Sequence, residues 1–375
     1  MIKSIIISGG GTGGHIFPAV AIADEVRRRY PQAHTLFVGA EGKMEMEKVP
    51  EAGYPIVGLP IRGLQRRLTA ENLLLPLRLI RSLRLAQGLL RQYKPDAVVG
   101  VGGYASGPLL LAARLAGVPY LIQEQNSYAG LTNRYLAKGA RVVCTAYPGM
   151  EAQLPGARLV LTGNPVRAGY EAERLAGLRA EALAYFGLRP DRPTLLVTGG
   201  SLGARTLNLA LEAGLEALAR AGCQVIWQTG KAFAPQAAAR AEAVQKMWAT
   251  SSEGVALWTS AFIARMDLAY AAADVVVARA GALTISELCL ANKPAILVPS
   301  PNVAEDHQTH NARALADQGA ARLVPDARAA TDLLPVALEL LQSPALLQDF
   351  ARKISNLVLP NAAARIADEL ERMAA

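Results

Sequence analysis

The chain contains little cysteine, and its three cysteines lie far apart. Cys144, Cys223 and Cys289 show neither the short spacing of a zinc site nor the density of a disulfide framework. We therefore expect buried thiols in a reducing compartment and no structural metal.

Long apolar runs are also missing. The longest stretch without Asp, Glu, Lys, Arg or His, residues 97–113, is slightly short for a membrane span. It is further broken by glycines and a proline: Gly100, Gly102, Gly103, Gly107 and Pro108. The chain begins directly with a strand-like run, which leaves no room for the basic and apolar regions of a signal peptide. The sequence thus predicts neither a spanning helix nor secretion.

Positive charge is concentrated in the first half of the chain. Residues 1–163 carry 19 basic and 10 acidic side chains, whereas residues 164–375 carry 20 basic and 21 acidic ones. The first half therefore holds the whole excess behind the net charge of +8. Residues 61–94 contain one acid, Glu71, against these basic residues: Arg62, Arg66, Arg67, Arg78, Arg81, Arg84, Arg91 and Lys94.

A long helix is predicted near residues 76–93, with Pro76 in its first turn. At about 100° per residue, one arc collects an apolar core face: Leu75, Leu79, Ile80, Leu83, Ala86 and Leu90. The opposite arc mixes arginines with leucines: Arg78, Arg81, Arg84 and Arg91 with Leu73, Leu74, Leu77, Leu85 and Leu89.

Two interpretations fit this mixed arc. It could dock on an anionic membrane surface through Leu74, Arg78, Arg81, Arg84 and Leu85. Alternatively, it is a solvated helix whose arginine stems cover its own leucines. Nucleic acid is disfavoured as a partner, because leucines rather than stacking aromatics separate the charges.

Two glycine-rich turns of the same design occur, one in each half. Residues 5–8 and residues 195–198 are apolar runs typical of buried parallel strands, and each leads through glycines into helix-forming sequence. Such turns direct free backbone N–H groups at an anion. Further strands are expected at residues 34–38, 55–59, 96–100, 119–123, 141–145, 223–228, 254–258, 274–278, 294–298 and 321–324.

These repeated strand–helix units predict an α/β fold of two doubly wound, Rossmann-like domains that face each other across a cleft. The segment 161–167, rich in Gly, Asn and Pro, is expected to be a hinge. Ligands should then bind at the carboxyl ends of the strands, where the glycine loops lie.

Gly9-x-Gly11-x-x-Gly14 also matches the dinucleotide fingerprint, and Glu41 fits its ribose-binding acid. An NAD-dependent oxidoreductase is therefore one alternative, although this motif alone is weakly specific. A Walker loop is excluded, because Gly14 is followed by His15 rather than lysine. A third glycine loop, residues 102–108, follows the strand at 96–100 and adds glycines at the same face.

Together these motifs resemble the MurG family of glycosyltransferases. The resemblance rests on residues 10–19, 102–108, 124–126, 163–167, 199–204, 280–287 and 304–308. It implies the GT-B fold, with an acceptor and membrane-docking domain at 1–163 and a UDP-GlcNAc-binding domain at 164–349. The C-terminal helix, about 350–375, is expected to pack back on the first domain.

The resemblance also implies an activity: inverting transfer of N-acetylglucosamine from UDP-GlcNAc to the 4-hydroxyl of MurNAc in undecaprenyl-pyrophosphoryl-MurNAc-pentapeptide, lipid I. The β-1,4-linked product is lipid II, a precursor in peptidoglycan synthesis, cell wall biogenesis, cell shape and division. The enzyme would act as a peripheral protein on the cytoplasmic face of the bacterial inner membrane, and cell-wall synthesis and division proteins would be its partners.

Site residues carry over by the same resemblance. Donor binding is expected at Thr12, Gly13, Gly14, Asn126, Arg167, Ser201, Ile263, Ala282, Leu283, Thr284, Ile285, Ser286, Glu287 and Gln308. Acceptor binding is expected at Gly10, Gly11, Gly102, Gly103, Tyr104 and Ser106. Glu287 suits the ribose diol, because a carboxylate accepts two hydroxyl hydrogen bonds.

The general base is expected to be either His15 or Glu124. A histidine has an ordinary pKa near neutrality, which suits proton abstraction, and Glu124 is the competing candidate. Many family members carry His-Glu-Gln-Asn where this chain has Gln123-Glu124-Gln125-Asn126, so a role of that histidine cannot be transferred.

No tightly bound cofactor is expected, because the sequence has no Asp-x-Asp pair to chelate a diphosphate-bound cation, although soluble Mg²⁺ could stimulate the reaction. Two alternatives besides the oxidoreductase stay open: a related GT-B enzyme that glycosylates diacylglycerol, and a sensor that binds the nucleotide sugar without catalysis.

Overall fold

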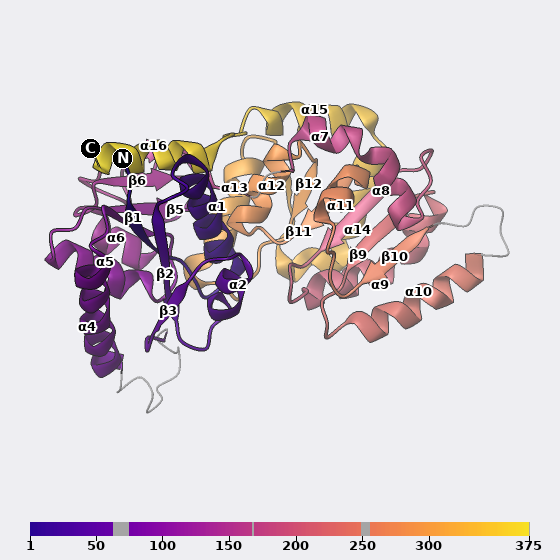
Figure 1. The fold of residues 1–375 in the computed structure, drawn as a ribbon. Coiled ribbons are helices and arrows are strands. Elements are labelled where there is room, and N and C mark those ends of the chain that lie inside the picture. The colour runs from indigo at the N-terminus through magenta and orange to yellow at the C-terminus, as the bar shows by residue number, and fades with distance from the viewer. Residues whose placement is uncertain (63–74, 167–168, 249–255, 375) are drawn as a thin grey trace. The chain divides into compact units, whose positions relative to one another are not determined.

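The protein forms two α/β units in a computed structural model that describes residues 1–62, 75–166, 169–248 and 256–374 (Figure 1). The first unit comprises Met1–Arg167 with Leu359–Ala375, and the second comprises Ala168–Val358. Among the described residues, no helix is long and apolar enough to cross a membrane.

The first unit is built on a parallel sheet with the strand order β3-β2-β1-β4-β5-β6-β7 in the described chain. Its strands are β1 (Ser4–Ser8), β2 (His34–Ala40), β3 (Ile56–Leu59), β4 (Ala97–Gly100), β5 (Tyr120–Glu124), β6 (Val142–Thr145) and β7 (Leu159–Leu161). Its helices are α1 (Gly13–Arg29), α2 (Glu45–Glu51), α4 (Leu75–Tyr93), α5 (Ser106–Leu115), α6 (Leu131–Ala137) and α16 (Ala362–Ala374). The strand order reverses between β1 and β4, which is where a doubly wound sheet opens to a ligand.

Alternation along the strands divides the side chains of this sheet between two cores. Ile5 and Ile7 of β1 pack with α1 and α16, whereas Ile6 packs with α4, α5 and α6. A strand buried on both faces needs apolar residues at every position, which explains the unbroken run of isoleucines. The glycine loop that follows β1 is thereby fixed to the centre of the sheet.

The second unit repeats this architecture with the strand order β10-β9-β8-β11-β12-β13. Its strands are β8 (Thr194–Thr198), β9 (Gln224–Gln228), β10 (Leu257–Ser260), β11 (Val275–Ala278), β12 (Ala295–Leu297) and β13 (Arg322–Leu323). Its helices are α7 (Ala172–Gly177), α8 (Arg179–Phe186), α9 (Arg205–Arg220), α10 (Ala234–Trp248), α11 (Met266–Ala272), α12 (Ala282–Leu290), α13 (His307–Ala316), α14 (Ala329–Leu341) and α15 (Pro344–Ser355), with short 3-10 turns η1 (Ala304–Asp306) and η2 (Asp326–Arg328).

The predicted fold class is confirmed, since both sheets are parallel and doubly wound. Every strand expected from the sequence overlaps an observed one, and the strand expected at 254–258 is found about three residues later. Strand β7 was missed, because its residues lie at the edge of the sheet and are only partly buried.

The three cysteines are free and buried, as predicted. Burial raises the pKa of Cys223 to about 11 and that of Cys289 to about 12. Both side chains therefore stay protonated at neutral pH and act as small apolar residues of the cores.

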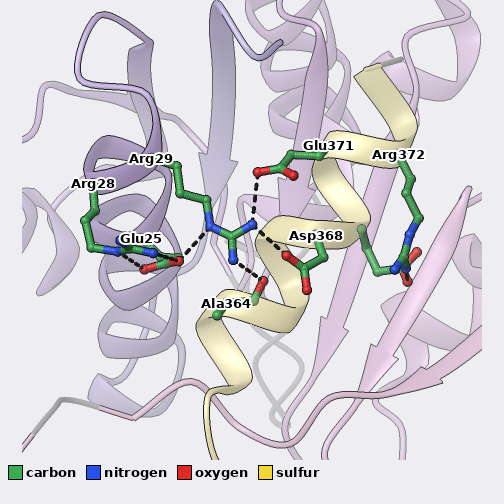
Figure 2. A network of polar contacts seen from close by, with 8 residues as sticks. Glu25, Arg28, Arg29, Ala364, Asp368, Glu371 and Arg372 are labelled. Atoms are coloured by element: carbon green, nitrogen blue, oxygen red, sulfur yellow. Dashed lines mark hydrogen bonds and ion pairs between the residues drawn. The ribbon is translucent and has the colours of Figure 1, made fainter.

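Helix α16 packs against α1 of the first unit (Figures 1 and 2). The Arg29 guanidinium donates to Asp368 at 2.6 Å, to Glu371 at 2.9 Å and to the Ala364 carbonyl at 2.9 Å (Figure 2). On the apolar side of α16, Ile366 and Leu370 are buried in the same core as β1. One arginine thus joins the last helix to the first.

The segment expected to return to the first unit was placed too early in the sequence. Phe350 and Ile354 of α15 are buried, and Phe350 lies in the core of the second unit. The portion assigned to the first unit begins at Leu359. The boundary between the two units therefore falls between α15, whose Phe350 packs in the core of the second unit, and α16, whose Ile366 and Leu370 pack in a core of the first.

The arginine cluster at the α1–α16 contact should make folding sensitive to acid. Hydrogen bonds from Arg28, supported by Arg29, lower the pKa of Glu25 from 4.5 to about 2 despite its partial burial. A depressed pKa in the folded state stabilises the protein above pH 4.5, and this contribution is lost as the pH falls from 4.5 towards 2. In Glu25→Gln, the free energy of unfolding should depend less on pH across this window. Denaturant titrations at several pH values give the free energy of unfolding, and an equal dependence on pH in both proteins would contradict this. Glu51→Gln, at an exposed pair with Lys48, is the matched control.

The amphipathic helix α4 buries a narrower face than predicted. Ser82, Ala86 and Leu90 are buried, whereas Leu79 and Ile80, expected in the core, are 41% and 48% exposed. The N-terminal turns of α4 extend beyond the sheet (Figure 1), and Leu75 and Leu83 are only partly buried against the core of the first unit. Leu77 and Leu85 are exposed as expected, and so are Arg81 and Arg84. Leu73 and Leu74 lie outside the described residues.

Candidate active site

The first glycine loop connects β1 to α1 at the switch point of the first sheet. Gly11 has a φ of 86°, a left-handed conformation that favours glycine. His15 N donates to Thr12 O at 3.1 Å and closes the first turn of α1. The amides of Gly13 and Gly14 precede that bond, and such amides point out of a helix N-terminus. Thr12 is exposed beside them.

The loop after β4 lies directly against the first one. A Cβ on Gly103 would come within 2.3 Å of Gly10 O, and one on Gly102 would come within 2.6 Å of the His15 ring. Both glycines also have positive φ values, 87° and 102°. The sequence needs glycine here because no other residue lets the two loops and the imidazole approach so closely.

The predicted acceptor residues at the start of α5 differ in exposure. Tyr104 is 51% exposed. Ser106 is buried, and its hydroxyl lies 2.7 Å from Gly102 O and 3.0 Å from Ser8 O. Ser106 therefore joins the two glycine loops, whereas Tyr104 is open to a ligand.

The His15 imidazole is oriented by the glycine loop itself. Its Nδ1 lies 2.9 Å from Gly10 O. A carbonyl oxygen only accepts hydrogen bonds, so Nδ1 carries the proton in the neutral ring and Nε2 carries the lone pair. In this tautomer the lone pair is on Nε2, the ring nitrogen nearer Gly102.

Glu124, the other candidate base, ends β5 and is 1% exposed. Its Oε1 accepts from the Asn126 amide N–H and side chain at 3.0 and 3.1 Å. Its Oε2 accepts from Gly130 N at 3.2 Å and from Asn133 Nδ2 at 2.7 Å. Four donors on one carboxylate fix the loop after β5, including the predicted donor-sugar residue Asn126.

Gln123 and Asn164 connect the end of β5 to the expected hinge. Gln123 Nε2 donates to Asn164 Oδ1 at 3.0 Å, and Asn164 Nδ2 donates to Gln125 O at 3.0 Å. Gln125 Nε2 in turn donates to Val101 O at 2.7 Å, next to the second glycine loop. The residue that departs from the family pattern thus has a structural partner. Arg167 at the end of this segment lies outside the described residues.

The second unit repeats the arrangement at its own switch point. Thr198 of β8 is in register with Ala278 of β11 and with Gln228 of β9, so the three following loops begin at one level. Gln228 Nε2 donates to Gly200 O at 2.8 Å. A Cβ on Gly203 would come within 2.2 Å of Thr229 O. Gln228 and Thr229, at the end of β9, thus contact this loop, and Ser201 within it is exposed.

Helix α12 follows β11 and carries a run of the predicted donor residues. Gly281, in extended conformation, precedes its first turn, and Ala282 and Ile285 face the core. Leu283 and Thr284 are half-buried, and Ser286 Oγ donates to Ala282 O at 3.0 Å. The N-terminal end of this helix therefore lies beside the Ser201 loop, at neighbouring strands of one sheet.

Glu287 is oriented by a buried tyrosine. The Tyr270 hydroxyl donates to Glu287 Oε2 at 3.0 Å. Full burial, and secondly the charge of Glu287, raise the pKa of Tyr270 well above its ordinary value. Tyr270 thus stays a donor at any physiological pH, and it was missed in the sequence because the pattern places it in an ordinary apolar helix.

Two further predicted donor residues lie on other elements of the second unit. Ile263 is buried in the segment after β10. Gln308, on the first turn of α13, accepts a hydrogen bond from Ser300 N at 2.8 Å. Gln308 therefore holds the loop after β12, which also begins at the carboxyl edge of the sheet.

One acidic residue beside the first glycine loop was not predicted from the sequence. Glu45 is 1% exposed and accepts from Gly11 N at 2.8 Å and from Ala40 N at 3.0 Å. Glu41, the candidate ribose acid of the oxidoreductase alternative, is exposed instead. Nothing in the pattern of α2 marks Glu45, since a buried acid at a helix start resembles an ordinary surface residue in sequence. Over the described ranges, no three His, Cys, Asp or Glu side chains gather as a metal site would require.

Comparison with known proteins agrees with both units. The glycosyltransferase family 28 N-terminal domain matches residues 5–145, and the glycosyltransferase family 28 C-terminal domain matches residues 194–369. A Parabacteroides distasonis protein named UDP-N-acetylglucosamine--N-acetylmuramyl-(pentapeptide) pyrophosphoryl-undecaprenol N-acetylglucosamine transferase is 52% identical over 98% of both chains. A Porphyromonas gingivalis protein of the same name is 52% identical over 98% of this chain and 95% of its own. A crystal structure of MurG from Acinetobacter baumannii is similar, with a TM-score of 0.77 and 32% identity over 99% of each chain.

Proposed function

The chain belongs to glycosyltransferase family 28, and we propose that it transfers N-acetylglucosamine from UDP-GlcNAc to lipid I, undecaprenyl-pyrophosphoryl-MurNAc-pentapeptide. The observation that carries the proposal is the 52% identity, over 98% of both chains, to a relative that bears the name of this transferase. Paired glycine loops at the switch points of both sheets support it, because each presents helix N-terminal amides suited to phosphate. The product is lipid II of peptidoglycan synthesis.

The donor is proposed to bind the second unit. The uracil lies against the backbone of Ile263, the ribose hydroxyls bind Glu287, and the diphosphate lies at the Ser201 loop and the N-terminus of α12. Support comes from the common level of these loops on neighbouring strands and from the Tyr270 hydrogen bond that fixes Glu287. Helix dipoles at both loops stabilise the negative charge of UDP as it leaves. Soluble Mg²⁺ and Arg167 are proposed to assist at the same charge.

His15 is the proposed general base. As the acceptor 4-hydroxyl attacks the anomeric carbon, its proton passes to His15 Nε2. The new C–O bond forms on the β face while the bond to the diphosphate breaks, and UDP keeps the electron pair. The tautomer set by Gly10 O supports this choice, whereas the four donors on Glu124 support a positioning role for that residue.

A direct transfer assay tests the proposal. Purified protein is given radiolabelled UDP-GlcNAc with a short-chain lipid I analogue, with diacylglycerol as the rival acceptor, while NADH oxidation is followed in parallel. Labelled disaccharide from lipid I alone is expected. Transfer only to diacylglycerol would redirect the enzyme to glycolipid synthesis, and UDP binding without transfer would favour a sensor.

We also propose that α4 docks the enzyme on the cytoplasmic face of the membrane, where a polyprenyl substrate resides. Leu77, Leu79, Ile80 and Leu85 are exposed beside the arginines of this helix. Leucines that insert and arginines that pair with lipid headgroups contribute together to binding at an interface.

Reversing the charge of this helix should release the protein from membranes. At about 1 kcal/mol for each basic residue near an anionic surface, changing Arg78, Arg81 and Arg84 to Glu should weaken binding to phosphatidylglycerol vesicles about 100-fold or more. Turnover of a soluble short-chain acceptor should persist. The control makes the same charge change at exposed arginines of the second unit: Arg220, Arg328 and Arg352. Equal loss of vesicle binding in both triple variants would mean that binding depends on the net charge of the protein and not on helix α4.

A further inference from the structure

A buried carboxylate and the His15 ring lie at opposite ends of a single peptide group. Glu45 Oε2 accepts from Gly11 N at 2.8 Å, and His15 Nδ1 lies 2.9 Å from Gly10 O. Gly10 O and Gly11 N belong to the same amide. The order is therefore carboxylate, peptide N–H, peptide carbonyl and imidazole N–H, with each donor directed at the next acceptor.

We propose that Glu45 is a positioning residue for His15, acting through the Gly10–Gly11 peptide. This inference rests on the proposed role of His15 as the base. Glu45 touches neither the imidazole nor a reacting atom. Its effect is to hold the peptide so that the carbonyl takes the Nδ1 proton and Nε2 keeps its lone pair.

The neighbouring glycines leave room for each member of this chain of contacts. A Cβ on Gly10 would lie 2.1 Å from Glu45 Oε1, and one on Gly39 would lie 2.6 Å from Glu45 Cγ. On the other side, Gly103 leaves space for Gly10 O and Gly102 leaves space for the His15 ring. Gly10 and Gly39 are therefore needed to make room for the Glu45 carboxylate behind the loop, besides any role of the loop glycines in phosphate binding.

A carboxylate is required at this position because both partners are donors. Glu45 Oε1 accepts from Ala40 N at 3.0 Å while Oε2 accepts from Gly11 N. Glutamine offers one acceptor oxygen and would turn its NH₂ towards the other backbone N–H. A buried N–H would then lose its partner, and the peptide would lose the negative charge at its N–H end.

The charge should matter most when His15 takes up a proton. A carboxylate at the N–H end polarises the amide, which strengthens the carbonyl as an acceptor. The stronger acceptor favours the imidazolium ion over the neutral ring. Removing the charge should therefore make His15 a weaker base, and the acid limb of the pH profile of kcat should move to lower pH.

Glu45→Gln tests the inference. We expect kcat to fall about 10- to 100-fold, by analogy with the loss of a partner that orients a metal-binding histidine, with the KM for UDP-GlcNAc unchanged. The matched control is Asp96→Asn. Asp96 Oδ2 also accepts from two backbone amides, Lys3 N at 2.6 Å and Ser4 N at 2.9 Å, at the other end of β1. Asp96→Asn should leave the pH profile of kcat unchanged.

The ring tautomer gives a readout that needs no turnover. In ¹⁵N spectra of the wild-type protein, neutral His15 should carry its proton on Nδ1, and Glu45→Gln should increase the Nε2-protonated form. A wild-type ring protonated on Nε2 overturns the inference, even if Glu45→Gln fails to fold. Loss of kcat in Glu45→Gln without a shift of the acid limb also overturns it. If instead His15→Ala retains full turnover, the proposed base fails and the tautomer result still stands by itself.

Discussion

Replacing His15 by alanine should lower kcat about 100- to 10,000-fold, the range that a positioned general base contributes. The affinity for UDP should stay unchanged, because the residues proposed to hold the uracil, the ribose and the diphosphate belong to the second unit. The structural reason is the fixed tautomer: Nδ1 is held by Gly10 O at 2.9 Å, so Nε2 is the basic atom. Single-turnover transfer to a short-chain lipid I analogue measures the loss, and calorimetry with UDP measures binding.

Glu124→Gln is the informative comparison for this experiment. The substitution keeps the shape of the side chain but places an NH₂ among four donors that now converge on the carboxylate. Its main effect should be a loss of stability, with disorder of the Asn126 loop. If His15→Ala instead keeps most of its turnover, while Glu124→Gln loses turnover at unchanged melting temperature, the base must be reassigned to Glu124.

The fold could be predicted from the sequence because parallel strands buried on both faces are uniformly apolar. Runs such as Ile5 to Ile7 and Leu195 to Val197 stand out against the helices that separate them, and each ends in a turn that needs glycine. Short, edge and amphipathic elements carry less information. Strand β7 is partly exposed, and the wheel of α4 could not show where the sheet beneath it ends.

The candidate site was predictable where backbone geometry demands a residue type. Gly11, Gly102 and Gly103 have positive φ, and Gly102 and Gly103 also lie in close contacts, so all three appear as motifs in the sequence. Side chains that act from behind the loops leave no such mark. Glu45 and Tyr270 come from helices whose sequences look ordinary, and only tertiary packing brings them to the glycine loop and to Glu287.

Replacing Glu287 by alanine should weaken UDP binding about 10-fold or more, since hydrogen bonds to a charged group are worth about 1.5–3 kcal/mol each. In the proposed complex the carboxylate accepts from the ribose diol, which a neutral methyl group cannot replace. The protein should stay folded, because Glu287 is only half-buried on α12. Isothermal calorimetry with UDP gives the affinity, and thermal unfolding checks the fold.

A ligand that lacks the ribose diol distinguishes two roles of Glu287: binding of the ribose and packing of α12. Wild-type protein should bind UDP more tightly than 2′,3′-dideoxy-UDP, and Glu287→Ala should bind the two with equal affinity. Tyr270→Phe removes only the hydroxyl that donates to Glu287 at 3.0 Å, so it should reduce affinity less and keep part of the preference for the diol. If Glu287→Ala still discriminates between the two ligands as the wild type does, the ribose is bound elsewhere and Glu287 serves the packing of α12 against α11.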